Sequence, residues 1–327
     1  MAIVAILEDI HGAFLEVPAI QKLRDRAEVR AFDHRLDPPE RAEALRDVDI
    51  VIGLRERTRF DTDFLRDAPS LRLIVQTGRI GPNVDVDAVN RAGVLIATAG
   101  GGSSSTTVEL TIGLMIAIMR RIPQSDRAIR DGRWDVPYGR GLRDKTLGIV
   151  GMGRIGTQVG EICARGFGMR LLAWSPTMTQ ERAAKAGGSA ASLEELLRAS
   201  DVVSVHLALN EGTRGLLSAD KLALMRPNGY LVNTSRGRVL DEPYLASMLR
   251  DGRLAGAALD VYWEEPLPRD HPFVGLDNVV LTPHVGWPAD NSYRAFAESA
   301  AADIEAFLDG SPINIANPEV AASRSRG

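Results

Sequence analysis

The sequence contains a single cysteine, Cys163, among its 327 residues. One thiol excludes an intrachain disulfide and a four-cysteine zinc site, and we predict no metal centre. The near absence of cysteine is typical of proteins in a reducing compartment, so we expect a cytoplasmic protein.

An excess of positive charge is also missing. The formal net charge is −4, and basic and acidic residues are mixed along the chain. Because no broad positive face is implied, nucleic acid is not expected as a partner.

Long apolar runs are absent as well. Residues 1–7 are apolar but carry no basic residue, and Glu8 and Asp9 follow them, which is typical of a strand rather than a signal peptide. The most apolar later stretch, residues 111–119, is far shorter than the ~20 residues that cross a bilayer. We therefore expect no membrane partner.

The composition that remains is that of a globular protein, and at the usual ~100 to 200 residues per domain the length indicates two domains. Short β-branched runs alternate with helical patterns, which predicts parallel α/β sheets. The first series of predicted strands covers residues 3–7, 29–32, 50–54, 71–77 and 94–97. The second covers residues 147–150, 170–174, 202–207, 230–233, 257–261 and 279–281. Six strands make a complete dinucleotide-binding sheet.

The glycine- and serine-rich stretch at residues 100–105 separates the two series and marks a predicted domain boundary. A helix predicted at about 107–121 is so apolar that a domain or subunit interface must cover it. A further helix is predicted at about 293–308, and a frayed tail at residues 321–327.

A glycine-rich loop, Gly151-Met152-Gly153-Arg154-Ile155-Gly156, follows the strand at 147–150 and opens a helix. This context favours dinucleotide binding over a purely structural turn. The first glycine permits the tight turn, the second lets backbone amides approach a pyrophosphate, and the third lets helix and strand pack closely. Cys163, farther along that helix, is predicted to be a buried thiol without a chemical role.

The strand after this loop ends at Ser175, where an acidic residue usually binds the adenosine ribose. We therefore expect either NAD or NADP as cofactor, with a slight lean to NADP. The first basic residue after Ser175 is Arg182. The segment directly after Ser175 therefore lacks a basic side chain that would attract a 2′-phosphate.

Three further motifs follow in order along the chain. They are Asn233-Thr234-Ser235-Arg236-Gly237 with Asp241-Glu242, then Leu259-Asp260-Val261-Tyr262-Trp263-Glu264-Glu265-Pro266, and Leu281-Thr282-Pro283-His284-Val285-Gly286. With these motifs the chain resembles the D-isomer-specific 2-hydroxyacid dehydrogenases, which include phosphoglycerate dehydrogenase and glyoxylate or hydroxypyruvate reductases. The resemblance covers nearly the whole chain.

The resemblance implies a Rossmann NAD(P)-binding domain, residues 101–287, inserted into a flavodoxin-like substrate domain, residues 1–100 and 288–327. It implies that a small 2-oxo or 2-hydroxy acid binds in the cleft between the domains. It also implies a homodimer through the helix at 107–119.

The resemblance places the catalytic residues at Arg236, Glu265 and His284. Hydride delivery to a ketone carbon builds negative charge on its oxygen, so a histidine titrating near neutral pH is a suitable proton donor. A carboxylate beside the imidazole raises its pKa, and a guanidinium can grip the substrate carboxylate. Glu265 is preferred to Glu264 because it directly precedes Pro266.

The resemblance also places Thr234 and Asp260 at the nicotinamide end of the cofactor. Substrate-side candidates are Arg55 and the loop at Arg79 and Ile80. Two departures concern this pocket, because Glu56 replaces the family's usual serine and Ile80 replaces a glycine. His206 is predicted to lie in a loop near the cofactor; the remaining histidines, His11, His34 and His271, are predicted to be structural or solvated.

Two alternatives stay open. Nucleotide-sensing corepressors share this fold and motif pattern, although the chain lacks their long disordered flanks and basic patches. A different hydride donor, such as formate or phosphite, has no supporting residue. The identity of the 2-oxo acid is not predicted.

Overall fold

The computed structural model describes residues 1–100, 104–135 and 138–320. Part of the predicted linker at residues 100–105 and all of the predicted tail at 321–327 lie outside the described residues. The chain divides into two compact units, Met1–Ser103 with Pro288–Gly327 and Ser104–Trp287. Each unit is built around its own sheet.

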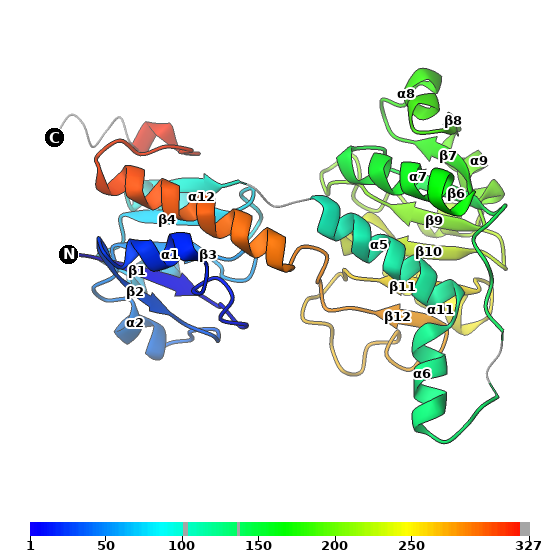
Figure 1. The fold of residues 1–327 in the computed structure, drawn as a ribbon, viewed down its shortest axis with the longest axis horizontal. Helices are drawn as coiled ribbons and strands as arrows, with labels where there is room; N and C mark the ends of the chain where they lie inside the picture. Colours follow the sequence, from blue (N-terminus) through cyan, green and yellow to red (C-terminus); the bar gives the residue numbers. More distant parts are fainter. Residues whose placement is uncertain (101–103, 136–137, 321–327) are drawn as a thin grey trace. The chain divides into compact units, whose positions relative to one another are not determined.

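The first unit contains a five-stranded parallel sheet (Figure 1). In spatial order its strands are β2 (Ala27–Ala31), β1 (Ala2–Leu7), β3 (Ile50–Gly53), β4 (Leu73–Thr77) and β5 (Leu95–Ala99). Every residue of β3 and β4 is buried, as expected for strands covered on both faces. This strand order is that of a flavodoxin-like sheet.

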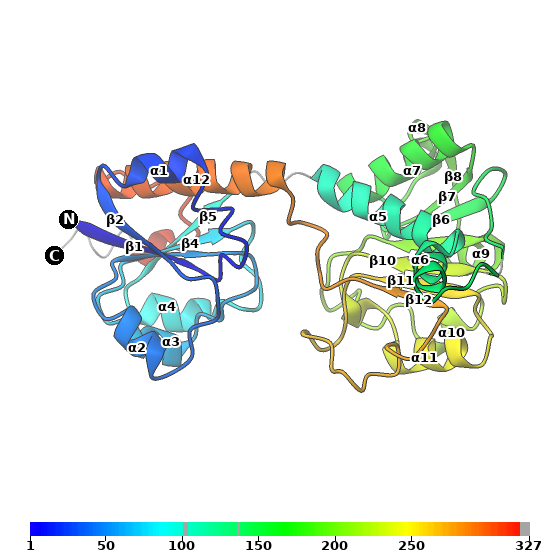
Figure 2. The same ribbon diagram turned by 60° about the horizontal axis from the view of Figure 1, so that its bottom comes forward.

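Helices cover both faces of the first sheet. Figure 2 shows α1 (Pro18–Leu23) and α12 (Asp290–Leu308) on one face, and α2 (Glu40–Ala44), α3 (Thr62–Asp67) and α4 (Val86–Arg91) on the other. Helices α3 and α4 begin after Asp61 and Asp85, whose carboxylates accept hydrogen bonds from backbone N–H groups of the first turn. These caps fix where each helix starts after the preceding loop.

Helix α12 belongs to the first unit although it follows the second unit in sequence. Phe296, Ala300 and Ile304, spaced four residues apart, are buried, and the helix packs against β4, β5 and α1. Farther on, the Asn317 side chain accepts a hydrogen bond from the Ile96 N–H and donates one to the Val94 carbonyl. The chain after residue 288 therefore completes the core of the first unit.

The second unit contains a seven-stranded parallel sheet. Its strands lie in the order β12 (Val279–Leu281), β11 (Gly256–Leu259), β10 (Tyr230–Asn233), β9 (Val202–Val205), β6 (Thr146–Val150), β7 (Arg170–Trp174) and β8 (Gly188–Ala190). From β8 to β11 this is the Rossmann order, and β12 is an additional strand beyond it.

The prediction of six strands in this region was wrong by one, because it omitted β8. That strand has only three residues, Gly-Ser-Ala, none β-branched or aromatic, and it pairs with β7 at the edge of the sheet. It carries no hydrophobic pattern from which it could be predicted.

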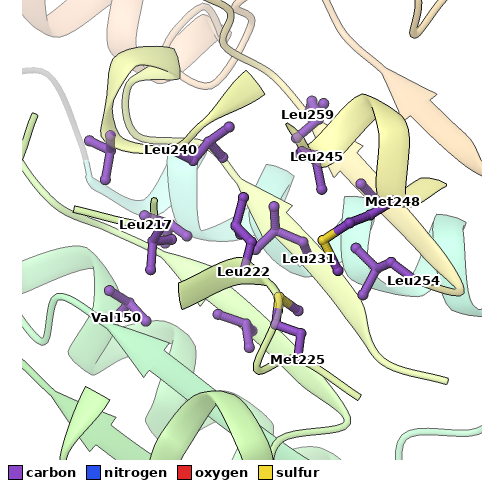
Figure 3. Packing of buried hydrophobic residues seen from close by; sticks show 14 of the residues in the cluster. Val150, Leu217, Leu222, Met225, Leu231, Leu240, Leu245, Met248, Leu254 and Leu259 are labelled. Carbon is purple, nitrogen blue, oxygen red and sulfur yellow. The ribbon is translucent and has the colours of Figure 1, made fainter. Parts of the chain in front are cut away.

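Two hydrophobic clusters hold the second sheet between its helices. On one face α5 (Ser104–Met119) and α7 (Arg154–Phe167) pack against the strands, together with α8 (Gln180–Lys185). On the other face lie α9 (Leu193–Ala199), α10 (Ala219–Leu222) and α11 (Glu242–Arg250). Figure 3 shows leucines and methionines of this second cluster, among them Leu222, Leu245 and Met248, meeting Val150 and Leu231 of the sheet.

Helix α5 ends earlier than predicted, at Met119 rather than Arg121. Arg121 has a φ of 53°, in the left-handed region, and Pro123 stands in the first turn of the next helix, α6 (Ile122–Arg130). Because a left-handed residue cannot continue an α-helix, the chain turns there and begins a new one.

Length and hydropathy rule out a bilayer-spanning role for each helix in the described ranges.

Candidate active site

The loop after β12 carries His284. Asp260, a fully buried residue after β11, holds this loop in place. The Asp260 carboxylate accepts hydrogen bonds from the Thr282 hydroxyl (2.5 Å) and from the backbone N–H groups of Val285 (2.8 Å) and Gly286 (2.9 Å). These bonds hold the loop on both sides of His284. They maintain its backbone at a φ of 55°, a conformation that a histidine rarely adopts without support.

Glu265 bridges two parts of the site. Its Oε2 lies 2.7 Å from His284 Nδ1, and its Oε1 accepts a hydrogen bond from the Tyr262 N–H at 2.9 Å. The Glu265 side chain is 36% exposed, and the adjacent Glu264 is exposed as well. With Nδ1 engaged by the carboxylate, Nε2 is the ring nitrogen of His284 that can reach a substrate.

The ionisation of the pair favours an imidazolium beside a carboxylate. Burial opposes the charged imidazole, but the hydrogen bond and charge of Glu265 outweigh it and raise the pKa of His284 above its usual 6.5. Burial likewise opposes the Glu265 carboxylate, yet the bond to His284 leaves the pKa of Glu265 below its usual value. At neutral pH the site can therefore hold a proton on His284.

Arg236 follows β10, immediately before the short 3-10 helix η1 (Gly237–Val239). The Asn233 side chain donates a hydrogen bond to the Arg236 carbonyl at 3.1 Å, and the guanidinium Nη1 donates to the Ser235 carbonyl at 2.7 Å. The Arg236 charge acts on both partners of the pair, since it lowers the pKa of Glu265 and opposes protonation of His284. The structure thus brings the three predicted catalytic residues together at the carboxyl edge of one sheet.

The predicted phosphate loop joins β6 to α7, and two of its glycines are required by close contacts. Gly151 has a φ of 103°, and a Cβ there would lie 2.7 Å from the His206 carbonyl oxygen. A Cβ on Gly156 would lie 2.3 Å from the Gly151 carbonyl oxygen. Gly153 and Arg154 are exposed, and a Cβ on Gly153 would meet open space, so its backbone is accessible to a phosphate.

Ser175 follows β7, one strand away from this loop. Its Oγ is buried and has no hydrogen-bond partner in the described part of the chain. Buried hydroxyls are normally satisfied, so an orphan at this place fits a ribose hydroxyl or phosphate oxygen supplied by a bound dinucleotide. The residues present therefore fit the NAD(P) that the sequence predicts.

Thr234 and Ile155 complete the cofactor-side candidates. The Thr234 hydroxyl is buried and lies 2.8 Å from the Thr111 hydroxyl of α5, while Ile155 in the first turn of α7 is half-buried. This contact links Thr234 to helix α5.

The substrate-side candidates Arg55, Arg79 and Ile80 lie in the first unit, after β3 and β4. The Arg55 guanidinium crosses Gly78 so closely that a Cβ there would overlap it, and it forms an ion pair of 3.5 Å with Glu56. Arg79 is exposed and Ile80 is half-buried. Glu56, the departure noted in the sequence, thus places a carboxylate beside Arg55.

Residues 112–286 match the family model described as D-isomer specific 2-hydroxyacid dehydrogenase, NAD binding domain. The glyoxylate reductase of Aeropyrum pernix is 37% identical over 321 residues, which is 94% of this chain and 95% of that protein. The chain belongs to the D-isomer specific 2-hydroxyacid dehydrogenase family. It is therefore an NAD(P)-dependent oxidoreductase of 2-hydroxy acids, with a Rossmann domain and a substrate domain.

Other members of the family agree with this assignment. The D-3-phosphoglycerate dehydrogenase of Methanocaldococcus jannaschii is 35% identical over 299 residues, covering 90% of this chain and 56% of that longer protein. A solved phosphoglycerate oxidoreductase from Vibrio cholerae O395 superimposes with a TM-score of 0.88 at 32% identity, covering 95% of this chain and all of that one.

Several residues that support the site were not singled out by sequence reasoning. The buried Glu242 accepts hydrogen bonds from the Trp263 N–H at 2.9 Å and from His271 Nε2, and the Tyr262 hydroxyl donates to the Leu259 and Thr282 carbonyls. Both hold the segment that carries Glu265. Their positions inside the family's motifs were the available signal, but the motifs do not show which contacts form.

Two other residues, His206 and Cys163, are uncharged near neutral pH. His206 follows β9 beside the phosphate loop, and burial lowers its pKa to about 4, so its ring is neutral near pH 7. Its Nε2 lies 2.9 Å from the Ser204 hydroxyl. Burial raises the pKa of the Cys163 thiol to about 12, which leaves it protonated and a weak nucleophile.

Proposed function

We propose that this chain reduces a small 2-oxo acid to the D-2-hydroxy acid, with His284 as the proton donor. The observation that carries this proposal is the 2.7 Å contact between His284 Nδ1 and Glu265 Oε2, with the pKa of His284 raised. A histidine protonated at neutral pH can give its Nε2 proton to the oxygen of a carbonyl that is gaining negative charge.

The carboxylate of Glu265 keeps the ring in the tautomer that leaves Nε2 for the substrate. As the proton leaves Nε2, the attraction between imidazolium and carboxylate is lost, so Glu265 also determines how readily His284 releases it. In the oxidation direction the same neutral ring accepts the hydroxyl proton. One pair thereby serves both directions.

Arg236 is the proposed anchor for the substrate carboxylate. A guanidinium can donate two parallel hydrogen bonds to a carboxylate and polarise the neighbouring carbonyl. We propose Arg55, Arg79 and Ile80 as further substrate-side residues, with Glu56 disfavouring substrates that bring a second negative charge. The proposed selectivity against doubly charged substrates arises from like-charge repulsion rather than from the size of the pocket.

The proposed cofactor residues are Gly151, Gly153, Arg154, Ile155 and Gly156 for the pyrophosphate, Ser175 for the ribose, and Thr234 and Asp260 for the nicotinamide end. When bound, NAD(P)H supplies the hydride. The absence of an acid at Ser175 removes the repulsion that would exclude a 2′-phosphate, so we expect a modest lean toward NADPH.

We also propose a homodimer. One side of α5 packs within its own unit, but Ile112 and Ile116 remain partly exposed, and Ile122 and Ile129 of α6 are 51% and 55% exposed. A partner subunit would remove this apolar surface from water. Light scattering at micromolar concentration should give the mass of two chains, and a monomer mass would refute the proposal.

The function is tested with a panel of 2-oxo acids, each with NADH and NADPH, by following the dinucleotide absorbance. At least one small 2-oxo acid should be reduced, and chiral chromatography should show the D product. Dinucleotide binding without turnover of any acid in the panel would contradict the proposal and favour a nucleotide-sensing role.

A further inference from the structure

We propose that Arg182 binds the 2′-phosphate of NADPH and selects NADPH over NADH; this inference rests on the dinucleotide site proposed above. Sequence spacing left Arg182 seven residues beyond Ser175, too far to assign. In the structure α8 brings it back to the phosphate loop, where its Nη2 lies 3.3 Å from the Met152 carbonyl oxygen. Met152 stands between the first two glycines of the loop.

The position of Arg182 is set by the turn that follows β7. The Thr179 hydroxyl accepts a hydrogen bond from the Arg182 N–H at 3.2 Å and starts α8. The guanidinium Nη1 then donates to the Thr177 carbonyl at 2.7 Å and to the Thr177 hydroxyl at 2.9 Å. The side chain is thereby held across the gap between the end of β7 and the phosphate loop, where an adenosine ribose lies in Rossmann domains.

Arg182 keeps its charge and part of its hydrogen-bonding capacity for a ligand. Its contacts are two carbonyls and a hydroxyl, and no carboxylate within the described ranges forms an ion pair with it. These bonds use at most three of the five N–H donors of a guanidinium, so at least two remain. The side chain is exposed on the surface, where a phosphate can reach it.

The surroundings of Arg182 suit a phosphate better than a ribose diol. The orphan Ser175 Oγ and the Thr177 hydroxyl can donate hydrogen bonds to phosphate oxygens. The first acid after β7 is Glu181, whose carboxylate pairs with Lys185 at 3.7 Å. A ribose 2′-hydroxyl is best bound by a carboxylate, which this strand end lacks. The three side chains together supply what the sequence alone did not show, a positive contribution to NADPH binding.

The test is a binding measurement that needs no turnover. Isothermal titration calorimetry compares NADPH with NADH, and 2′,5′-ADP with 5′-AMP, on the full chain. The unaltered chain should bind 2′,5′-ADP at least about tenfold more tightly than 5′-AMP. Arg182→Ala should weaken NADPH binding by about 10- to 100-fold, as expected for charged hydrogen bonds, and change the Kd for NADH by less than about twofold.

Two further variants separate a ligand contact from a structural one. Arg182→Gln keeps a polar side chain with two N–H donors but lacks the charge, and it should lose NADPH affinity as well. Lys185→Ala removes another cation from the same helix, one that pairs with Glu181 at 3.7 Å, and should change neither affinity. Equal weakening of NADPH and NADH in the Arg182 variants, or no preference of the unaltered chain for 2′,5′-ADP, would overturn the proposal.

The outcomes also separate this proposal from the proposed function. Arg182-dependent NADPH binding without reduction of any 2-oxo acid would refute the catalytic function and leave the role of Arg182 supported. Reduction of 2-oxo acids with NADPH binding that does not depend on Arg182 would refute only the present inference.

Discussion

Two glutamate–histidine pairs lie in the second unit, and they engage their imidazole rings differently. His271 donates from Nε2 to Glu242 at 3.2 Å, while its Nδ1 accepts a hydrogen bond from the Phe273 N–H at 3.3 Å. His284 contacts Glu265 through Nδ1 at 2.7 Å, and in the described part of the chain its Nε2 has no partner. Both nitrogens of the His271 ring therefore form contacts within the protein, whereas Nε2 of His284 is available to a substrate.

The two pairs also differ in whether a ligand can reach them. Glu242 is 6% exposed and also accepts the Trp263 N–H, so its pair fixes a loop. The pair of Glu265 and His284 lies beside Arg236 at the ends of strands, where a ligand can reach it. A carboxylate next to a histidine therefore indicates catalysis only when one ring nitrogen remains available.

The largest expected effect comes from removing each histidine in turn. His284→Ala should lower the rate of 2-oxo acid reduction by about 10² to 10⁴, because the proton donor is lost, while the Kd for the dinucleotide stays nearly unchanged. His271→Ala is the matched control and should keep the reduction rate within about threefold once the fraction of folded protein is corrected. Equal losses in the two variants would remove the distinction between the pairs.

Arg236 offers the next test. Arg236→Lys keeps the charge but loses the planar fork, so kcat/KM should fall by about 10- to 100-fold through weaker binding of the substrate carboxylate. The control is Arg238→Lys two residues away, whose guanidinium lies 5.8 Å from the Trp263 ring centre and should matter little. If Arg236→Lys retained the kcat/KM of the unaltered enzyme, Arg236 could not be the substrate anchor.

The pH dependence of reduction should shift when the carboxylate partner of His284 is removed. Because the pKa of His284 is raised above 6.5, kcat/KM for reduction should stay high past pH 6.5 and fall only as pH rises through the raised value. Glu265→Gln removes the stabilising charge and should move this fall to lower pH. Glu242→Gln should leave the profile where it is, and an identical shift in both variants would contradict the assignment.

The smallest effect concerns stability rather than chemistry. Glu242→Ala leaves the Trp263 N–H without its acceptor and should lower the free energy of unfolding by about 1 to 3 kcal/mol. Denaturant titration measures this change. The exposed Glu264→Ala should change it by less than about 0.5 kcal/mol, and a Glu242 variant as stable as that control would mean that the buried pair does not hold the loop.

Much of the fold could be predicted from the sequence because buried strands and helices require apolar residues at regular spacing. The β-branched strands of both sheets and the helix at α12 were found from periodicity, and the glycines of the phosphate loop from their spacing. Strand β8 was not found, because a three-residue edge strand buries too little to need apolar residues. The end of α5 was missed because it depends on one left-handed arginine.

The site was predictable to a different degree. Residue types and family motifs placed Arg236, Glu265 and His284 at neighbouring strand ends, where parallel topology gathers such residues. The support from Asp260, Thr282 and Glu242 depends on loop conformations, which periodicity does not encode. The contact between Arg182 and the Met152 carbonyl could not be predicted for the same reason, since distance along the chain does not show the turn that brings them together.

The place of α12 also bears on the order in which the protein can fold as it is synthesised. The second unit is one continuous segment, Ser104–Trp287, whereas the first needs α12 and Asn317 to cover β4 and β5. A ribosome delivers those residues only after the whole second unit has been made. Although domains usually fold from the N-terminus onward, here the inserted unit can be complete while β4 and β5 of the first sheet are still uncovered on one face.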